Sequence, residues 1–378
     1  MRDASRIAFL VGLRLPEQPG YLVDEHLEEL AELASSAGFE TAGRAVQSRR
    51  GPDSRTFIGK GKATEIGTAA NHLGADLVVF DDDLTPSQVK NLEKILEVEV
   101  IDRSALILEI FFRNARTREA RTQVELAQLN YMLPRLTRKW THLSRQVGGI
   151  GVRGGEGETQ LEVDRRMMRQ RIAQLRRDLE KIERTRQVQR KGRRHADLVA
   201  LAGYTNAGKS TLFNRLTRAG TKVEDRLFAT LDSKLRRGSI GNGRVAVFSD
   251  TVGFIRKLPH HLVASFRSTL EEITLAGVVL HVIDRSHPQW EDQKKVAEEV
   301  LTDLGIATDV IVCVFNKSDR LGETVPANGE DFWISALNGT GIEELKAEIV
   351  RRLVGRPGTF TRSTREELRL REPHHRSA

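Results

Sequence analysis

A glycine-rich stretch in the middle of the chain has the residue types and spacing of a phosphate-binding loop. Gly203 and Gly208 enclose four residues, and Lys209 and Ser210 follow directly. A loop around a polyphosphate must aim backbone N–H groups inward, and glycines allow the dihedral angles that this needs. The lysine then reaches the β- and γ-phosphates, and the serine hydroxyl binds Mg²⁺. The predicted loop comprises Gly203, Tyr204, Thr205, Asn206, Ala207, Gly208, Lys209, Ser210 and Thr211.

A second phosphate-site motif, Asp250-Thr251-Val252-Gly253, follows the apolar run 245–248. We expect Asp250 to hold Mg²⁺ through water and the Gly253 N–H to contact the γ-phosphate. Most Asp-x-x-Gly sequences are turns, but the position of this one after the phosphate loop and after a strand favours the functional interpretation. Between the motifs lies Phe228-Ala229-Thr230, where we expect Thr230, in preference to Thr221, to complete the Mg²⁺ shell.

Selection of the base depends on Asn316-Lys317-Ser318-Asp319. The Asp319 carboxylate can accept hydrogen bonds from N1–H and the exocyclic amine of guanine, whereas adenine has no donor at N1. We therefore predict GTP rather than ATP. Asn316 and Lys317 are expected to brace the phosphate loop and cover the base, and Ser335-Ala336-Leu337 to hold the guanine oxygen. Taken alone, the motif would be a polar turn after a strand at 310–315; the order of the motifs favours a guanine site.

The residues after Asp-x-x-Gly indicate a slow enzyme. Many small GTPases place a glutamine there to orient water, but this chain has Phe254 and Ile255, which cannot do acid–base chemistry. The predicted catalytic residues are Lys209, Thr230 and Gly253, which act by positioning and by charge. We predict GTP hydrolysis to GDP and phosphate that is slow alone and faster when a partner orders the switch loops.

Two kinds of ion are predicted at this site. Ser210, Thr230 and Asp250 are the candidate ligands of Mg²⁺. Asn206 is a candidate ligand of K⁺, because related GTPases use an asparagine at this place in the loop to hold that ion. Equal turnover in K⁺ and Na⁺ buffers would exclude the second role.

The positive charge of the chain is concentrated in one segment. The net charge is +8, yet residues 165–194 hold thirteen Lys and Arg against three acids, so the remainder is slightly negative. Apolar residues recur there at helical spacing, which predicts one long amphipathic helix. A helix at 117–133 could pack against its apolar seam, joined by the glycine-rich stretch 148–157. A solvated helix usually mixes charge signs, so the one-sided surplus favours binding to RNA.

The chain of 378 residues has room for several domains. Residues 1–114 alternate strand-like and helix-like segments and predict an α/β domain. We expect a basic helical hairpin at 115–195, a P-loop GTPase domain with a doubly wound, mostly parallel sheet at 196–355, and a charged, disordered tail at 356–378. Within the first domain, Gly59-Lys60-Gly61-Lys62 lacks the spaced glycine and the Ser/Thr, so a turn before a helix is favoured over a nucleotide or RNA contact.

The remaining composition indicates a cytoplasmic protein. The single cysteine, Cys313, lies in an apolar run, which favours a small core residue over a nucleophile or ligand and fits a reducing compartment. No apolar stretch approaches the length of a membrane span. We therefore expect a cytoplasmic monomer without a membrane span.

Together the motifs resemble those of the HflX-family GTPases, a branch of the translation-factor-related GTPases, over nearly the whole chain. Beside the GTP motifs, the resemblance is carried by Phe57-Ile58-Gly59-Lys60-Gly61-Lys62, Val124-Glu125-Leu126-Ala127-Gln128-Leu129, Gly157-Glu158-Thr159-Gln160-Leu161-Glu162 and Asp164-Arg165-Arg166. It implies binding to the large ribosomal subunit and its rRNA, and GTP-controlled splitting or rescue of stalled ribosomes. Members often carry a folded C-terminal extension, for which the predicted tail is too short, so contacts of that extension are not expected.

Two other functions fit the residues. A GTP-switched regulator would bind a protein partner through the hairpin and use its charge only for solubility. An RNA-remodelling protein would have a second nucleotide-dependent activity in the N-terminal domain. Steep weakening of binding with salt would favour RNA, and ATP turnover that survives loss of Asp319 would favour the second activity.

Overall fold

The computed structural model describes residues 6–136, 160–191, 197–220, 226–228, 230–241, 243–257, 267–321 and 331–354. The chain forms two compact units: the first comprises Met1–Ile182, Glu224–Asp232 and Arg256–Ser268, and the second comprises the rest. The predicted glycine-rich connection, the tail, Thr221 and Ala229 lie outside the described residues. The predicted three domains and tail stay a prediction. No helix in the described part of the chain is long and apolar enough to cross a membrane.

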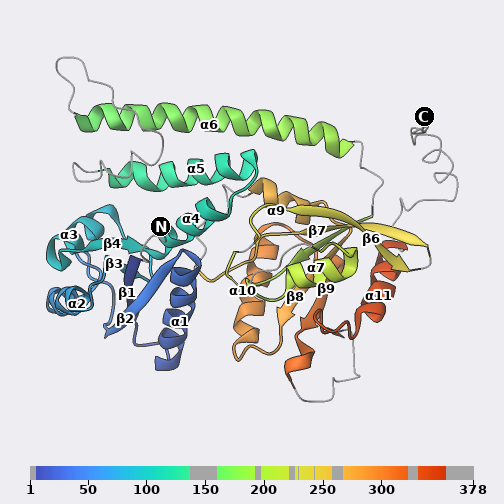
Figure 1. Ribbon diagram of the computed structural model, residues 1–378, viewed down its shortest axis with the longest axis horizontal. Coiled ribbons are helices and arrows are strands. Elements are labelled where there is room, and N and C mark those ends of the chain that lie inside the picture. Colours follow the sequence, from blue (N-terminus) through green and yellow to red (C-terminus); the bar gives the residue numbers. More distant parts are fainter. Residues whose placement is uncertain are drawn as a thin grey trace, which may run out of the picture. The chain divides into compact units, whose positions relative to one another are not determined.

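The first unit contains a small parallel sheet (Figure 1). Its strands lie in the order β2-β1-β3-β4 and pair in parallel throughout. Parallel neighbours need crossover connections, which here are helices, so the alternation of segments in the sequence predicts this sheet. The bounds are β1 Arg6–Arg14, α1 Gly20–Ser36, β2 Phe39–Ser48, α2 Lys60–His72, β3 Leu77–Phe80, α3 Pro86–Leu96 and β4 Glu99–Asp102.

Three helices follow this sheet: α4 (Arg103–Asn114), α5 (Arg118–Met132) and α6 (Gln160–Lys191), with a short 3-10 turn η1 (Leu133–Arg135) after α5. The sequence predicted α5 and α6 but not α4. Asp102 ends β4 and also caps α4, since its carboxylate accepts a hydrogen bond from the Ala105 N–H at 2.9 Å. With no loop between strand and helix, no turn residues mark the boundary.

Helices α5 and α6 lie side by side, as the predicted hairpin requires (Figure 1). The apolar seam of α6 is buried at Val163, Met168, Ile172 and Leu175. The Arg171 guanidinium donates two hydrogen bonds to the Glu125 carboxylate of α5, at 2.6 and 2.9 Å. Arg171 therefore links the two helices, although it belongs to the segment 165–194 whose surplus of charge favoured binding to RNA.

The second unit contains a six-stranded sheet in the order β10-β9-β8-β5-β7-β6. All pairs are parallel except β6 with β7. The predicted doubly wound, mostly parallel fold is thus confirmed. The bounds are β5 Leu198–Ala202, α7 Lys209–Thr217, β6 Lys234–Gly241, β7 Arg244–Asp250, α9 Arg267–Thr274, β8 Val278–Asp284, α10 Trp290–Asp303, η3 Thr308–Val310, β9 Ile311–Asn316, η4 Ser318–Arg320, β10 Phe332–Trp333 and α11 Ile342–Val354.

Alternating strand residues separate the two faces of this sheet. Leu280 and Val282 of β8, and Val312 and Val314 of β9, belong to one buried apolar cluster with residues of α7 and α11. Because successive strand residues point to opposite faces, the intervening side chains of β8 and β9 face the side of α10. The predicted motifs follow the carboxyl ends of β5, β7 and β9, where ligands bind in such folds.

Candidate nucleotide site

The backbone of the phosphate loop requires its two glycines. The loop joins β5 to α7, and Gly203 and Gly208 have φ angles of 144° and 90°. A Cβ on Gly203 would lie 2.2 Å from the Val282 carbonyl oxygen, and one on Gly208 would lie 2.2 Å from Asn316 Nδ2. No other residue type fits either position without moving these neighbours.

Lys209 lies inside the loop with only 5% of its surface exposed. Its Nζ donates hydrogen bonds to the carbonyl oxygens of Gly203 at 3.0 Å and Tyr204 at 2.6 Å. Burial lowers the pKa of this ammonium to about 8, and the charge of Asp250 partly opposes the shift. A phosphate would supply the negative charge that a buried lysine lacks.

Ser210 and Asp250 provide oxygen ligands of the kind that Mg²⁺ prefers. The Ser210 hydroxyl donates to Asp250 Oδ2 at 2.7 Å. Asp250 is fully buried, so a divalent cation beside its carboxylate would stabilise the charged form. The neighbouring Thr251 hydroxyl donates to the Leu201 carbonyl at 2.6 Å, which fixes the motif to β5. The Ser210 hydroxyl and the Asp250 carboxylate therefore fit a magnesium ion as ligands.

Gly253 and Phe254 lie directly against the phosphate loop. The Thr205 N–H donates to the Phe254 carbonyl at 2.7 Å, and the Phe254 N–H donates to the Gly203 carbonyl at 3.0 Å. A Cβ on Gly253 would lie 2.8 Å from Thr205 Cα and 3.0 Å from Lys209 Nζ. The Phe254 side chain is 1% exposed. Phe254 thus fastens the two motifs to each other through its backbone and offers no group to activate water.

The guanine motif is joined to the phosphate loop by one side chain. Asn316 donates from Nδ2 to the Ala207 carbonyl at 2.9 Å and accepts at Oδ1 from the Ala336 N–H at 2.9 Å. Asp319 accepts a hydrogen bond from the buried Ser335 hydroxyl at 2.5 Å. The phosphate loop, the guanine motif and the segment 335–337, which the sequence assigned to GTP, therefore meet at one edge of the sheet.

Two residues of this site had not been predicted. The first is Asp284, the last residue of β8, whose carboxylate pairs with Lys317 Nζ at 2.7 Å. Lys317 itself has a φ of 65°. An acid directly after a buried apolar run was a usable signal. Arg215 donates from Nε to the Ala336 carbonyl at 3.2 Å and also bonds the Leu337 carbonyl. No local pattern marks this arginine, because its acceptors lie more than a hundred residues away in sequence.

The other predicted residues vary in their exposure. Asn206 is exposed and has a φ of 60°, and Leu337 is 72% exposed. Thr205, Val252 and Ala336 are buried, whereas Thr211 and Ser318 are partly exposed. The role of Asn206 as a K⁺ ligand stays a prediction.

Thr230 and Phe228 belong to the first unit. Asn114 donates to the Phe228 carbonyl at 2.8 Å, and the Phe228 ring packs edge-on against Phe111 with centroids 4.7 Å apart. Asp232 accepts hydrogen bonds from the Thr117 N–H at 3.2 Å and from the Thr117 hydroxyl at 2.5 Å. Thr230 itself is buried, and its role as a Mg²⁺ ligand stays a prediction.

The segment after the Gly253 motif is also held within the first unit. Lys257 pairs with Asp81 and Asp82, each at 2.5 Å. Arg256 lies 3.5 Å from Glu29. The segment that precedes β6 and the segment that follows the second phosphate motif thus both have charged or hydrogen-bonded anchors within the first unit.

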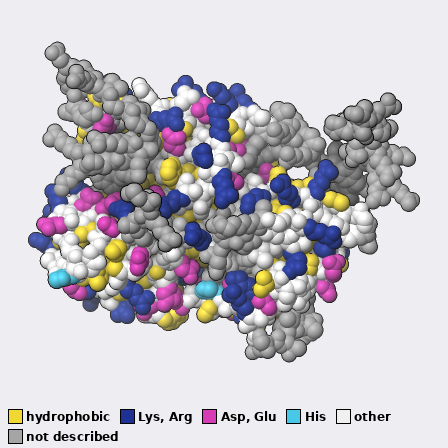
Figure 2. All heavy atoms as spheres, in the orientation of Figure 1, with side chains coloured by type: hydrophobic (Ala, Val, Ile, Leu, Met, Phe, Trp, Pro, Cys, Tyr) yellow, Lys and Arg dark blue, Asp and Glu magenta, His cyan; other side chains and the backbone are white. Residues whose placement is uncertain are grey.

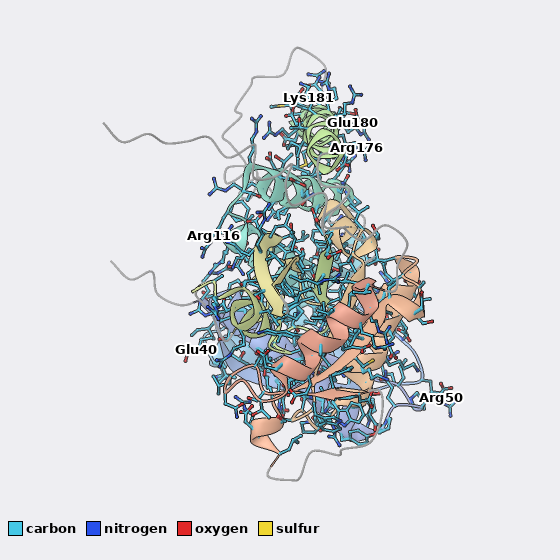
Figure 3. The ribbon with its side chains drawn as sticks, turned by 90° about the vertical axis from the view of Figure 1, so that its right-hand side faces the viewer. Glu40, Arg50, Arg116, Arg176, Glu180 and Lys181 are labelled. Carbon is cyan, nitrogen blue, oxygen red and sulfur yellow. The ribbon has the colours of Figure 1, made fainter. Side chains whose placement is uncertain are left out.

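A basic surface covers α6. Lys and Arg side chains gather over this helix in Figure 2. Figure 3 labels Arg176, Glu180 and Lys181 on α6, outside its contact with α5. Arg169, Arg176 and Arg177 are exposed, so three guanidinium groups are available to a phosphate backbone.

Three family models match successive parts of the chain. They are described as GTP-binding GTPase N-terminal (residues 24–112), GTP-binding GTPase Middle Region (114–193) and 50S ribosome-binding GTPase (198–317). Among curated proteins, GTPase HflX of Magnetococcus marinus is 48% identical over 337 residues, covering 87% of this chain and 78% of its own. GTPase HflX of Escherichia coli is 46% identical over 379 residues, covering 98% of this chain and 88% of its own.

A solved structure shares the overall fold. The crystal structure of a complex of SsGBP and GDP is 24% identical, covers 92% of this chain and 98% of its own, and superposes with a TM-score of 0.50. At this identity the similarity concerns the fold alone.

Proposed function

The chain belongs to the HflX family of GTPases, and we propose that it binds the large ribosomal subunit in the cytoplasm under the control of GTP. It binds GTP and GDP and hydrolyses GTP, as its family and its GTPase domain show. The proposal concerns the target and the purpose of that reaction. The observation that carries it is the basic surface of α6, together with a family model described as a 50S ribosome-binding GTPase.

The charge of α6 supports RNA as the target. Arg169, Arg176 and Arg177 are exposed on it, while Arg171 is engaged with Glu125 of α5. Cations on a helix stiffened by a second helix can contact phosphates without ordering new structure. Each phosphate contact releases counterions, so binding weakens steeply with salt.

In the proposed reaction this chain supplies position and charge. Lys209 contacts the β- and γ-phosphates, and the Gly253 N–H contacts the γ-phosphate. Ser210 and Asp250, with Thr230, hold Mg²⁺, which neutralises the developing negative charge when it is bound. The buried Phe254 provides no base, so hydrolysis is slow until the ribosome orders the segments around Thr230 and after Gly253.

We further propose that GTP hydrolysis ends the ribosome-bound state and that the bound protein splits or rescues stalled ribosomes. Asn206 is the proposed ligand of K⁺ beside the phosphates. The anchors of Phe228 and Lys257 within the first unit support a coupling between nucleotide state and the part of the chain that includes α6.

Co-sedimentation with ribosomes tests this function. We expect the protein to migrate with the 50S subunit in the presence of a non-hydrolysable GTP analogue and to be released with GDP. Failure to co-migrate in any nucleotide state would contradict the proposal. Sucrose gradients of 70S ribosomes incubated with protein and GTP then separate splitting, which yields free subunits, from binding alone.

A matched pair of variants separates RNA from a protein partner. The variant R169Q/R176Q/R177Q removes three exposed charges from α6, and R50Q/R55Q/R237Q removes three exposed charges elsewhere. We expect the first to reduce the slope of log affinity against log salt by roughly two to three and the second to leave it unchanged. Equal slopes in both variants would favour the GTP-switched regulator that binds a protein.

A further inference from the structure

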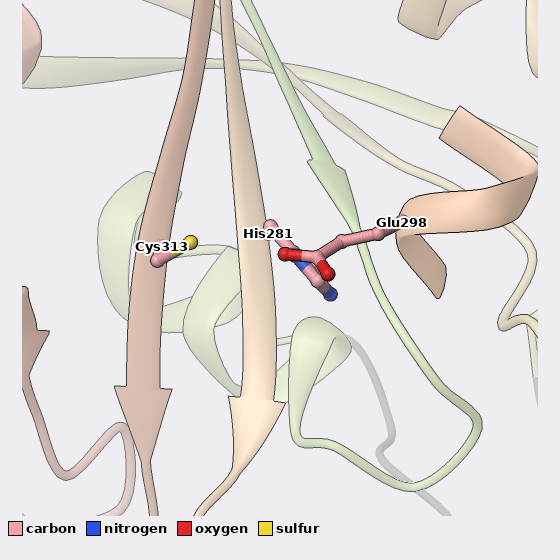
Figure 4. A group of neighbouring side chains, drawn as sticks. All are labelled: His281, Glu298 and Cys313. Atoms are coloured by element: carbon pink, nitrogen blue, oxygen red, sulfur yellow. The ribbon is translucent and has the colours of Figure 1, made fainter. Parts of the chain in front are cut away.

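We infer that His281, Glu298 and Cys313 bind a divalent metal ion of the zinc class, at a site distinct from the nucleotide site. The three residues come from β8, α10 and β9. Their potential ligand atoms all lie within 4.8 Å of one another. Figure 4 shows the Glu298 carboxylate beside the His281 ring and the Cys313 side chain directed from β9 toward β8.

The sheet topology explains why these side chains meet. His281 and Cys313 are directly paired in the register of β8 with β9. Their strand neighbours Leu280, Val282, Val312 and Val314 all belong to the apolar cluster on the other face. His281 and Cys313 therefore both point to the α10 side, where Glu298 faces them.

His281 is the observation that calls for a ligand. Its side chain is 1% exposed, and neither ring nitrogen has a hydrogen-bond partner. A buried polar group without a partner is destabilising, and a neutral imidazole is the commonest metal ligand in proteins. Burial, with Lys294 and Lys209 nearby, lowers the pKa of His281 to about 4, so the ring is neutral at pH 7.

The donor set selects the class of metal. One imidazole nitrogen, one thiolate and one carboxylate oxygen are ligands of Zn²⁺, and the thiolate argues against Mg²⁺ and Ca²⁺. Three protein ligands leave one tetrahedral position for water or another small ligand. The sequence had favoured Cys313 as a small core residue; the structure adds the histidine and the carboxylate that make it a candidate ligand.

Two features of the site oppose metal binding. Lys294 pairs with Glu298 Oε1 at 3.2 Å, so binding uses the other carboxylate oxygen or displaces this lysine. Burial raises the pKa of the Cys313 thiol, so the metal has to displace its proton, which goes to solvent. Binding should therefore tighten as pH rises.

The site is placed to affect guanine binding. Strand β8 ends at Asp284, which pairs with Lys317, and β9 ends at Asn316, which braces the phosphate loop. A metal would link these strands and α10 behind the residues that hold the base. The inference does not depend on the ribosome role, because the three ligands lie in the second unit and the test measures metal binding without ribosomes.

Titration of the tag-free full-length protein with Co²⁺ tests the site. Tetrahedral Co²⁺ bound to a thiolate gives a sulfur-to-metal charge-transfer band, and Cys313 is the only cysteine in the chain. We expect this band to saturate at one Co²⁺ per chain, to vanish in C313S, and to be lost on addition of Zn²⁺. Co²⁺ binding without the band, as at oxygen ligands of the magnesium site, would overturn the inference.

Ligand variants and matched controls sharpen the result. We expect H281Q and E298Q to weaken Co²⁺ affinity by at least about 10-fold, the lower bound for loss of a group that merely supports a ligand. E299Q and H72Q change exposed residues nearby and far away and should bind normally. An unchanged circular-dichroism spectrum shows that each variant is folded.

Thiol reactivity of the unmodified chain gives an independent measurement. We expect Zn²⁺ to slow the reaction of Cys313 with a disulfide reagent by about 10-fold or more, because a coordinated thiolate is a poor nucleophile while bound. An unchanged rate at a Zn²⁺ concentration that saturates binding would also overturn the inference.

Discussion

Two helices in different units begin with the same pair of residues and have different surroundings. Gly59 caps α2 and precedes Lys60, and Gly208 caps α7 and precedes Lys209. Gly59 has a φ of −63°, which any residue can adopt, whereas Gly208 has a φ of 90°. Lys60 is exposed, while Lys209 is buried among loop carbonyls. A glycine–lysine pair at a helix start is therefore not sufficient for a phosphate site.

The loop before each helix makes the difference. The Gly59 N–H donates to the Gln47 side chain at 2.7 Å, so one backbone donor at the start of α2 is already used. Before α7, six residues after β5 curve back on themselves and are held by Phe254 and Asn316. Helix N-termini attract anions only where their N–H groups remain available. The structure places Gly59 directly before α2 and Lys60, Gly61 and Lys62 in the first turn of that helix; the preference for a structural role over a nucleotide or RNA contact stays a prediction.

The largest expected difference in activity is between variants of the two lysines. K209A should lower the rate of GTP hydrolysis by about 1,000-fold, since a preorganised charge at the transferred phosphate is lost. K60A should leave the rate within about twofold of the original. Phosphate release under saturating GTP measures both. Similar losses in the two variants would show that the N-terminal turn takes part in the reaction.

Loss of the base-selecting acid should be next in size. D319A removes acceptors for two guanine donors, which should weaken GDP binding by about 100-fold. Fluorescent GDP titration gives the affinity, and ATP titration of the same variant tests the first unit. ATP turnover that persists in D319A would show a second nucleotide site, so that both units would bind a nucleotide.

The two glycines should differ in their tolerance of alanine. G208A places a Cβ against Asn316 in a left-handed conformation, and we expect a loss of about 2 kcal/mol in the free energy of unfolding. G59A meets the flexible ends of two side chains, Arg49 at 2.8 Å and Gln47 at 3.2 Å, so we expect a change within about 0.5 kcal/mol. Urea unfolding with GDP absent measures both. Equal losses would contradict the difference in backbone between the two turns.

The smallest expected effect is a pH dependence of GDP binding. The pKa of Lys209 is about 8 without nucleotide, and a bound phosphate raises it. Below pH 7 the lysine is charged in both states, so affinity is constant with respect to this group. As pH rises through 8 the free protein loses the proton, and affinity should fall by about fourfold between pH 7 and 8.5. Titration calorimetry in two buffers should detect proton uptake near pH 8; K60A should behave like the unmodified protein.

Local pattern explains why most elements and motifs could be predicted. Strand β5, the phosphate loop and α7 occupy consecutive residues, so their order and their glycines can be read directly. The parts that could not be predicted depend on distant partners. Arg215 contacts Leu337 across 122 residues, and Arg171 contacts Glu125 across 46. Helix α4 was missed because Asp102 ends a strand and caps a helix at once.

The sequence by itself determined the ligand and the reaction: contiguous motifs at Gly203, Asp250 and Asn316 specify GTP, because each carries its chemistry within four to nine residues. Only the tertiary structure decided what surrounds them. The pairing of β8 with β9 placed His281 beside Cys313, and the packing of α5 on α6 engaged Arg171 with Glu125. Side chains on different elements acquire neighbours only when the sheet register and the helix packing are set, and no local pattern encodes that choice.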